Sequence, residues 1–399
     1  MLVPYIPLNI ALFTAVIGGL FMALSFRRTG RSPKVGAVIG AIGGGIGGQL
    51  FMLPLNYCTF EAERKPLDVV IGLVLVATGA AVVLLTLRWL LVVLPSNRTD
   101  GSHGQSGLFR GSITPWLLLL PTLIILVLFL YYPFLDTFRL STQLARVGAP
   151  RTVFRCVDNF SSLLNETRYI NSVAVTFVIA AATVILGLLL ALLIASVAYQ
   201  PIKGANIYRT LLIWPYALSP AVAGIIFYMI FNQTAGIANA LVESLFGGNG
   251  LQWLSTPGLA ILVVVLASVW KTTGFNILFY IAGLQNVPND LREAAAIDGA
   301  NVIQRFWRIT VPMVSPITFF LIITNTTYAF FDIFGTIDTL TTGGPAGATT
   351  VMIYRIYEQG VTEGNIGIAA AQSVILFILV IGLTLLQFRT TGRRVNYGA

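Results

Sequence analysis

The sequence has little charge, one histidine and two cysteines. Asp, Glu, Lys and Arg make up 10% of its 399 residues, against 56% hydrophobic residues, and the mean hydropathy is +0.84. So little charge excludes a large soluble domain. The single histidine, His103, has no cysteine or carboxylate cluster beside it, which excludes an ordinary zinc site there. The composition therefore predicts an all-α, polytopic membrane protein.

Catalytic motifs are also missing. The sequence contains no Gly-x4-Gly-Lys-Ser/Thr phosphate loop and no His-Glu-x-x-His motif. Its carboxylates are scattered, so they do not form the acid-base constellation that a membrane-embedded transferase needs. We therefore expect a chain that is not an enzyme and binds no metal. The net charge of +9 is explained by basic loops beside apolar spans and does not indicate nucleic-acid binding.

Nine apolar runs are long enough to cross a membrane as helices. They lie near residues 3–25, 35–55, 68–94, 114–134, 172–198, 207–232, 258–285, 312–335 and 367–388. The first run has no basic segment before it and no clear cleavage site. We therefore interpret it as a span rather than a signal peptide.

The chain divides into four parts. Residues 1–95 are predicted to be an accessory module of three spans, 96–112 a flexible linker, 113–390 the core, and 391–399 a tail. The second span carries a glycine at every fourth position, a pattern that favours close packing of a neighbouring helix. These glycines are Gly36, Gly40, Gly44 and Gly48.

A polar segment, residues 289–312, separates the seventh and eighth runs. Asp290 and Glu293 are three residues apart and fit a helix N-cap with its capping-box carboxylate. Gly299 fits the left-handed residue that stops a helix. On these local features alone, an ordinary amphipathic loop helix is an equal alternative.

A second short helix is expected at residues 302–309. Val302, Phe306 and Ile309 would share one face of this helix. Pro312 would end it and open the next span, because proline cannot continue a helix that needs its N–H.

Polar and charged side chains also occur inside the predicted spans. Lys271 lies near the middle of the seventh span, where an unpaired ammonium is costly. It is either a ligand for an anionic substrate or a structural partner of Asp332. Asn325, Tyr328 and Asp332 are spaced three and four apart, so they are expected on one helical face. The candidate substrate pathway comprises Lys271, Asn276, Asn325, Tyr328, Asp332, Gln372 and Ser373.

The polar segment resembles the EAA loop of ABC importer permeases. Glu293-Ala294-Ala295 is followed by Gly299, by Ile309 and by Val311-Pro312, where that family usually has Leu-Pro. The resemblance implies that residues 289–312 form two short helices that dock into a cleft on a separate cytoplasmic ATPase subunit. It assigns ATPase coupling to Glu293, Ala294, Ala295, Gly299, Ile309 and Pro312.

The resemblance extends from about Ile113 to Arg389 and is greatest to the A-type permeases of glycerol-3-phosphate importers. Its other motifs are Val157-Asp158-Asn159-Phe160, Tyr328-Ala329-Phe330-Phe331-Asp332, Gly343-Gly344-Pro345, Ile353-Tyr354-Arg355-Ile356-Tyr357 and Ala370-Ala371-Gln372-Ser373. It implies a six-helix type I permease core, to which the three N-terminal helices are additional. At Cys156-Val157 the family often has Gly-Leu.

The resemblance also implies partners. A second permease subunit would form the other half of the translocation pathway, and two ATPase subunits, one homodimer, would use ATP and Mg. An extracytoplasmic solute-binding protein would contact Gly343, Gly344 and Pro345. The chain would lie in the lipid of a bacterial-type inner or plasma membrane, bind no cofactor itself and contact no nucleic acid.

Orientation follows if the EAA loop is cytoplasmic. The N-terminus then lies outside, the linker and the C-terminus are cytoplasmic, and the inside segments hold most of the lysines and arginines. Cys58 and Cys156 both fall outside. A disulfide between them is geometrically open, and nothing else in the sequence supports it.

The substrate stays open at this point. Glycerol-3-phosphate, or a related small polyol or sugar, would use Lys271 as its cation. A neutral oligosaccharide or glucosylglycerol would instead use aromatic and amide groups, for which Trp270, Tyr328, Asn325 and Gln372 are available. An ion-coupled secondary transporter is the rival of another class, because intramembrane Lys and Asp suit ion coupling. It would not need an EAA loop.

Overall fold

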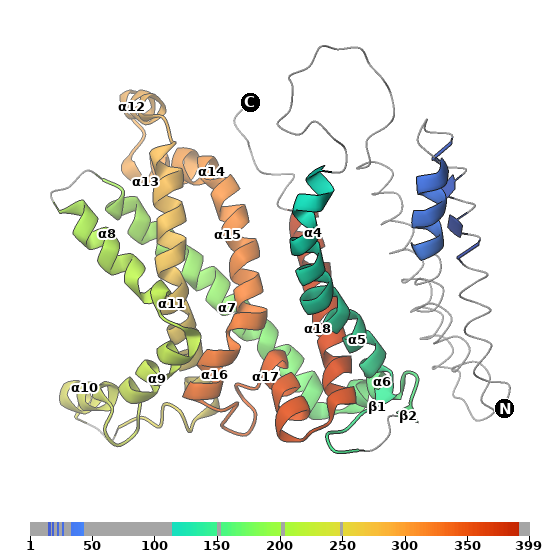
Figure 1. Cartoon of the computed structure of the whole chain (residues 1–399). Helices are drawn as coiled ribbons and strands as arrows, with labels where there is room; N and C mark the ends of the chain where they lie inside the picture. The colour runs from blue at the N-terminus through green and yellow to red at the C-terminus, as the bar shows by residue number, and fades with distance from the viewer. Residues whose placement is uncertain are drawn as a thin grey trace, which may run out of the picture. The chain divides into compact units, whose positions relative to one another are not determined.

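The computed structural model describes residues 15–16, 18–19, 22–23, 26–27, 33–43, 114–149, 153–200, 204–247 and 250–390. Contacts divide the chain into two compact units, residues 1–161 and 162–399, and each is described by itself. Figure 1 shows the course of the helices. The predicted third span, 68–94, and the linker 96–112 lie outside the described residues, and so does the tail 391–399.

Unit 1 contains one long apolar helix and a small polar corner. Its elements are a helix at Pro33–Gly43, α4 (Thr114–Leu126), the π-turn η1 (Val127–Tyr131), α5 (Tyr132–Ser141), β1 (Gln143–Leu144), β2 (Val153–Phe154) and the start of α6 (Asp158–Asn165). The two strands pair antiparallel. Asn159 of α6 connects the end of α5 to β1, because its Nδ2 donates to the carbonyl oxygens of Ser141 at 2.8 Å and Gln143 at 2.9 Å.

Two sequence features of unit 1 can be checked. A Cβ on Gly40 would lie 2.1 Å from the carbonyl oxygen of Gly18, so this glycine does meet a neighbouring backbone closely, as its spacing predicted. Gly44 and Gly48 lie outside the described residues. Cys156 is disulfide-bonded and has a φ of 54°, the left-handed conformation that a glycine would adopt freely. Cys58 lies outside the described residues.

Unit 2 is an all-helical bundle. Its elements are α7 (Thr167–Ala198), α8 (Ala205–Ile213), the 3-10 turn η2 (Trp214–Ala217), α9 (Pro220–Ile230), α10 (Ile237–Phe246), α11 (Pro257–Gln285), α12 (Asn289–Ile297), α13 (Val302–Arg305), the π-turn η3 (Phe306–Thr310), α14 (Val311–Met313), α15 (Ser315–Thr327), the π-turn η4 (Tyr328–Asp332), α16 (Phe334–Leu340), α17 (Met352–Tyr357), the π-turn η5 (Glu358–Thr362) and α18 (Ile366–Thr390).

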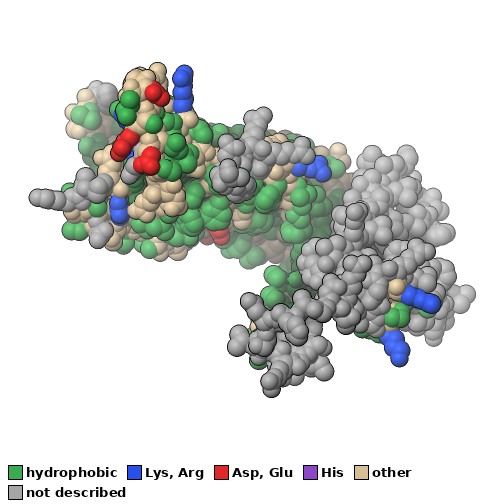
Figure 2. Space-filling model, turned by 90° about the horizontal axis from the view of Figure 1, so that it is seen from above, with side chains coloured by type: hydrophobic (Ala, Val, Ile, Leu, Met, Phe, Trp, Pro, Cys, Tyr) green, Lys and Arg blue, Asp and Glu red, His purple; other side chains and the backbone are tan. Residues whose placement is uncertain are grey.

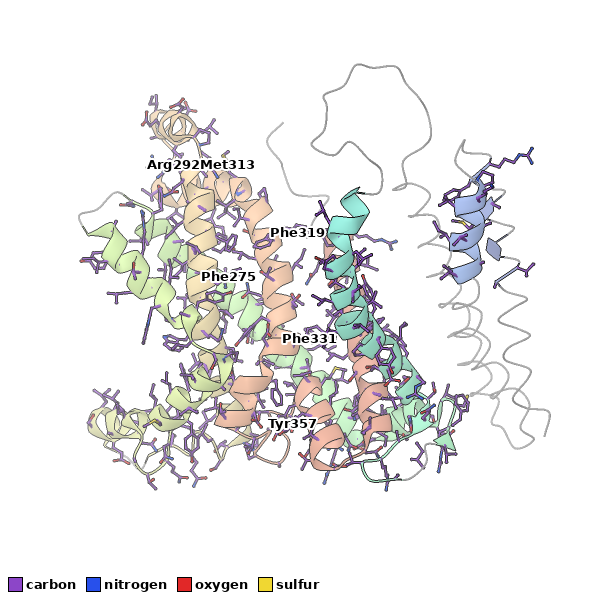
Figure 3. The ribbon with its side chains drawn as sticks, viewed as in Figure 1. Phe275, Arg292, Met313, Phe319, Phe331 and Tyr357 are labelled. Atoms are coloured by element: carbon purple, nitrogen blue, oxygen red, sulfur yellow. The ribbon has the colours of Figure 1, made fainter. Side chains whose placement is uncertain are left out.

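These elements define two ends of unit 2. In Figure 1, α12 projects at one end, while α9, α10, α16 and α17 gather at the opposite end. Figure 3 marks the same two ends with Arg292 and Met313 near α12, and with Tyr357 on α17.

The helices α7 and α11 form the centre of unit 2. Gly187 of α7 faces α11, since a Cβ there would lie 3.6 Å from Oγ1 of Thr272 and 3.7 Å from Nδ2 of Asn276. Ala191 and Ala195 continue this small-residue face and are fully buried. In a membrane, small residues let two helix backbones approach closely and gain van der Waals contact.

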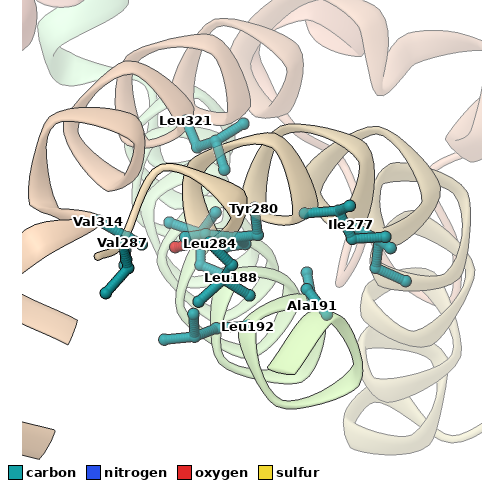
Figure 4. Close-up of a cluster of buried hydrophobic side chains, with 11 residues drawn as sticks. Leu188, Ala191, Leu192, Ile277, Tyr280, Leu284, Val287, Val314 and Leu321 are labelled. Atoms are coloured by element: carbon teal, nitrogen blue, oxygen red, sulfur yellow. The ribbon is translucent and has the colours of Figure 1, made fainter. Parts of the chain in front are cut away.

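A hydrophobic cluster closes the α12 end of this centre. Leu188 and Leu192 of α7, Tyr280 and Leu284 of α11 and Leu321 of α15 pack together there (Figure 4). Val287 and Val314, which flank the polar segment, belong to the same cluster. The polar segment is therefore anchored at both of its ends in the core of the bundle.

The predicted spans are confirmed in part. Within the described residues, four helices are long and apolar enough to cross a membrane: Leu118–Ser141, Thr167–Ala198, Pro257–Gln285 and Ile366–Thr390. Two bent pairs raise the number of candidate spans to at most six. The predicted runs 172–198, 258–285 and 367–388 each fall inside one of these helices.

The predicted run 207–232 is not one straight span. Residues 207–217 and 220–230 form two helical pieces bent by 99°. Pro215 and Pro220 remove two backbone donors, and Oγ of Ser219 instead accepts a hydrogen bond from the N–H of Val222 at 3.3 Å, which starts α9.

Close packing against α16 holds the second piece, α9. A Cβ on Gly224 would lie 2.0 Å from Oγ1 of Thr339 and 2.8 Å from the carbonyl oxygen of Thr336. Both threonine hydroxyls donate to α9 backbone, Thr336 to Pro220 at 3.1 Å and Thr339 to Ala221 at 3.0 Å. The bend is thus fixed by tertiary contacts as well as by the prolines.

Candidate functional site

The polar segment between α11 and α15 begins with α12. Its N-cap is Pro288, without a side-chain hydrogen bond, so the predicted cap at Asp290 with a capping box to Glu293 is wrong. Because the helix begins at Asn289, Asp290 lies in its first turn, where a carboxylate still complements the helix dipole. Glu293 is exposed on this helix.

Gly299 ends α12 as predicted. Its φ is 81°, and the backbone closes a Schellman motif. The N–H of Gly299 donates to Ala296 at 3.1 Å, and the N–H of Ala300 donates to Ala295 at 2.9 Å. A Cβ on Gly299 would meet no atom within 4 Å. The backbone conformation, and not crowding, is therefore what requires glycine.

The second helical piece runs further than predicted. It extends from Val302 to Met313 and bends by 67° into the piece Ser315–Asp332, so the next span opens at Ser315 and not at Pro312. The π-turn η3 precedes Pro312 and shifts the hydrogen bonds by one residue, so that the N–H of Val311 donates to Phe306. Such a turn helps the helix to continue into a proline.

The capping box of this segment is at the second helix. Oδ1 of Asn301 accepts from the N–H of Gln304 at 2.8 Å, and Oε1 of Gln304 accepts from the N–H of Asn301 at 3.0 Å. The pattern of an N-cap amide followed three residues later by Gln was present in the sequence and could have been found.

Apolar side chains are exposed at the tip of the segment. Ile297 is 87% exposed, Val302 72% and Ile303 70%. Val302 therefore does not share the inward face of Phe306 and Ile309, which are half-buried, and that part of the expectation is wrong. Figure 2, seen from the α12 end, shows acidic, basic and hydrophobic side chains together on this tip.

Cationic contacts hold the segment to the bundle. The guanidinium of Arg292 lies 5.5 Å from the ring centroid of Tyr199, at the end of α7. Arg209 of α8 donates from Nη2 to the carbonyl oxygen of Tyr199 at 3.1 Å, which caps the same helix. Sequence reasoning missed the roles of Tyr199 and Arg209, because only the fold brings them beside Arg292.

Lys271 of α11 is buried between two tyrosines. Lys271 is 6% exposed. Its Nζ lies 5.2 Å from the ring centroid of Tyr216 and 5.3 Å from that of Tyr328. Among the described residues Lys271 forms no salt bridge. Asp332 is exposed and acts on the ammonium only through its electrostatic field.

The expected single face of Asn325, Tyr328 and Asp332 is wrong. Asn325 is buried and Asp332 is exposed, because the π-turn η4 spans Tyr328–Asp332 and rotates the end of the helix. The π-turn left no signal in the residue spacing. Asn325 instead pairs with Asn276 of α11 by two side-chain hydrogen bonds, of 2.7 Å and 3.2 Å.

The two candidates on α18 differ from each other. Gln372 is fully buried, and neither its Oε1 nor its Nε2 has a hydrogen-bond partner. Ser373 donates from Oγ to the carbonyl oxygen of Ala369 at 2.9 Å, so its hydroxyl is used within the helix. The structure thus groups Lys271, Asn276, Asn325 and Tyr328 on α11 and α15–η4, and it shows no contact that joins Gln372 or Ser373 to them.

The loop at the opposite end is folded on itself. The N–H of Gly344 donates to Thr341 at 2.9 Å, and the threonines at 349 and 350 donate to the carbonyl oxygens of Gly344 and Gly343. Gly343 is buried, whereas Gly344 and Pro345 are half-buried. Much of the backbone that we expected to face a partner is therefore used inside the loop.

A charged cluster fixes α17 beside this loop. Arg355 is buried and donates to Glu166 at 2.7 Å, to Glu358 at 2.5 Å and to Glu363 at 3.4 Å. Burial by itself lowers the pKa of Arg355, but hydrogen bonds and attraction from Glu358 and Glu166 outweigh it, so the pKa is raised above its usual value. The guanidinium thus ties α17 to the start of α7.

The described residues contain no group of three or more His, Cys, Asp or Glu side chains that could hold a metal ion. The polar groups gathered here serve helix packing, loop folding and the surroundings of a buried cation. The arrangement is that of a helical membrane protein with a projecting polar segment.

Comparison with known proteins gives the family. The pattern of the binding-protein-dependent transport system inner membrane component matches residues 184–391. The sn-glycerol-3-phosphate transport system permease protein UgpA of Rhizobium meliloti (strain 1021) is 42% identical over 296 residues, which cover 74% of this chain and 100% of the relative. The protein of the same name from Pectobacterium atrosepticum is 41% identical over 291 residues, 72% of this chain and 97% of the relative.

Two solved structures have a similar fold. One is a bacterial ABC transporter involved in the import of the acidic polysaccharide alginate, with a TM-score of 0.61, 21% identity, and coverage of 70% of this chain and 95% of that chain. The other is a bacterial alginate ABC transporter in complex with an alginate pentasaccharide-bound periplasmic protein, with a TM-score of 0.62, 21% identity, and coverage of 72% and 96%.

The chain belongs to the family of binding-protein-dependent transport system inner membrane components. It is a permease subunit of a binding-protein-dependent ABC importer, a multi-pass inner-membrane protein and not an enzyme. ATP is hydrolysed by separate ATPase subunits of such importers, and the secondary-transporter alternative is set aside.

Proposed function

We propose that this permease forms half of the translocation pathway for glycerol-3-phosphate or a closely related small polyol phosphate. The observation that carries the proposal is the identity of 42% with a permease named for sn-glycerol-3-phosphate, across the whole length of that relative. The buried ammonium at Lys271 supports it, because a phosphate ester needs a cation somewhere along its pathway. Asn276, Asn325, Tyr328 and Asp332 would supply further polar contacts, with Gln372 and Ser373 on α18.

The projecting segment would couple the permease to its ATPase. Glu293, Ala294 and Ala295 lie on α12, Gly299 makes the bend, and Ile309 and Pro312 lie in the second helix. The exposed apolar tip supports docking, since Ile297 and Val302 would otherwise face water on the polar side of a membrane protein. Glu293 would pair with a basic group of the ATPase.

The assembly would contain a second permease, an ATPase homodimer that uses ATP and Mg, and an extracytoplasmic solute-binding protein. The loop with Gly343, Gly344 and Pro345 lies at the end of unit 2 opposite α12, where a binding protein would dock while the ATPase occupies the α12 end. In this assembly the α12 end and the C-terminus face the cytoplasm, and the N-terminus lies outside. Residues 1–95 would be an accessory membrane module joined by the cytoplasmic linker 96–112 to the core 113–390.

A neutral glycoside is the second candidate substrate. It is favoured by the aromatic surroundings of Lys271 and by the Asn276–Asn325 amide pair, which could contact hydroxyl groups.

Uptake into proteoliposomes distinguishes the two candidate substrates. The complete complex, with ATP and its binding protein, is offered labelled glycerol-3-phosphate or labelled glucosylglycerol. We expect accumulation of the phosphate ester; accumulation of glucosylglycerol alone would transfer the assignment to the neutral class.

A further inference from the structure

Lys271 occupies a site that lacks an opposite charge. Its ammonium contacts two aromatic rings and forms no salt bridge among the described residues. Cation–π contacts offset only part of the cost of burying an ammonium inside a membrane. An anion that reached Nζ would complete the site, since Asp332, the carboxylate whose field acts on the ammonium, is exposed and not paired with it.

Both rings sit on irregular backbone. Tyr216 belongs to the 3-10 turn η2 at the 99° bend, and Tyr328 begins the π-turn η4. Broken membrane helices and π-turns occur where a helix lines a cavity or has to move. Each ring can therefore change position by a local backbone adjustment, while the long helix α11 that carries Lys271 stays packed against α7.

The two rings differ in exposure. Tyr216 is 45% exposed, whereas the hydroxyl of Tyr328 is buried. Ser268, one turn before Thr272 on α11, also has a buried hydroxyl. Phe275 packs against Tyr216 with ring centroids 4.9 Å apart. Of the two rings beside the ammonium, Tyr216 is therefore the more accessible one.

We propose that Lys271 is a gated anion subsite for the phosphate group of the substrate, and that Tyr216 is its gate. This proposal rests on the proposed function, because it names the part of the pathway that recognises the charged end of a phosphate monoester. Without substrate, Tyr216 and Tyr328 cover the ammonium. When a phosphate monoester arrives, Tyr216 moves aside and the dianion pairs with Nζ. Tyr328 is a positioning residue that holds the lysine side chain in place.

Uptake by the complete reconstituted complex tests the subsite. The variants are Lys271→Met, which removes the charge, Lys271→Arg, which keeps a cation, and Tyr216→Leu, with Tyr228→Leu as the control because Tyr228 is a comparably exposed tyrosine on α9. We expect Lys271→Met to lower glycerol-3-phosphate uptake at least tenfold and Lys271→Arg to restore a large part of it. Tyr228→Leu is expected to transport normally.

A labelling experiment tests the gate without relying on transport. Lys271→Cys is labelled with an anionic methanethiosulfonate reagent, alone and combined with Tyr216→Leu or Tyr228→Leu. We expect Tyr216→Leu to raise the labelling rate severalfold and Tyr228→Leu to leave it unchanged. Equal rates in all three backgrounds would overturn the gate.

The outcomes separate the subsite from the proposed substrate. If the wild-type complex accumulates the phosphate ester and Lys271→Met accumulates it equally well, the subsite is wrong and the substrate stands. If the wild-type complex accumulates only the neutral glycoside, the proposed substrate is wrong, and the phosphate subsite is overturned with it. Labelled glycerate serves as a second anion, and glycerate uptake that Lys271→Met lowers as strongly as glycerol-3-phosphate uptake would reduce the claim of a phosphate site to one for anions in general.

Discussion

Asn276 and Asn325 exchange two hydrogen bonds between α11 and α15 in the buried centre of unit 2. Nδ2 of Asn325 donates to Oδ1 of Asn276 at 2.7 Å, and Nδ2 of Asn276 donates back at 3.2 Å. Asn325 also donates to the carbonyl oxygen of Leu321 at 2.8 Å. Inside a membrane these amides have no water to replace a lost partner, so each residue depends on the other.

This pair gives the first prediction. Replacing Asn276 by Leu, or Asn325 by Leu, should lower the unfolding free energy of the complex by about 1–2 kcal/mol, since each leaves a buried amide unsatisfied. The double variant should lower the unfolding free energy by less than the sum of the two single effects, and the coupling energy should be about 0.6–1.7 kcal/mol. Denaturant unfolding in a bilayer mimetic measures the unfolding free energies of the single and double variants. Asn286→Ala at the exposed end of α11 is the control, and strictly additive effects would show that the amides act independently.

Gly224 is the contact between the bent helix α9 and α16. We expect Gly224→Ala to destabilise the complex by about 1–3 kcal/mol, because the added Cβ would meet Thr339 and the backbone of Thr336. Gly258→Ala is the matched control, since a Cβ there would meet nothing within 4 Å. Thermal unfolding compares the two, and equal melting temperatures would show that α9 can move away from α16 without cost.

Gly299 and Gly247 form a matched pair for the coupling role. Both end a helix with positive φ, 81° and 65°, and a Cβ on either would meet nothing within 4 Å. Alanine should therefore cost about 1 kcal/mol of local strain at each position. Only Gly299→Ala is expected to lower substrate-stimulated ATP hydrolysis and uptake. An equal loss of transport in Gly247→Ala would mean that strain, and not ATPase docking, accounts for the effect.

Arg355 should matter far more than an exposed arginine. Its removal in Arg355→Met leaves Glu166, Glu358 and Glu363 without their common cation. These glutamates are partly exposed, so solvent reduces the cost, and we expect about 2 kcal/mol of lost stability. Arg139→Met is the control, because the Arg139 side chain is 59% exposed and its ion pair with Asp136 contributes little. Limited proteolysis at the α17 loop and thermal unfolding of the two variants would show whether Arg355 holds α17 in place.

Several features of the fold could be predicted because their signals are local. Apolar runs long enough to span a bilayer placed the helices that contain residues 172–198, 258–285 and 367–388. Gly299 could be placed in the left-handed region because only glycine enters it without strain. The EAA pattern located the projecting segment because this signal is also local: its two short helices and their bend are encoded in consecutive residues.

The errors arose where distant residues or small backbone shifts decide the outcome. The π-turn at Tyr328–Asp332 turns Asp332 away from Asn325, and regular helical spacing cannot indicate it. The 99° bend after Ala217 depends on α16 as well as on Pro220, so the two prolines alone did not show how far the helix would turn. Val302 is exposed at the tip of a segment that is anchored through Val287 and Val314, and the amphipathicity of one helix does not reveal this arrangement.

The sequence by itself determined that this chain is a helical membrane protein with a polar segment between two spans, because hydrophobic length, missing charge and glycine conformation act within short stretches of chain. Only the tertiary structure decided the partner of Lys271. The sequence left a choice between a substrate and Asp332, and the fold places the ammonium between Tyr216 and Tyr328 without a salt bridge to Asp332. Those rings come from segments more than fifty residues away from Lys271 on either side, and only packing of the bent helix and the π-turn against α11 brings them to it.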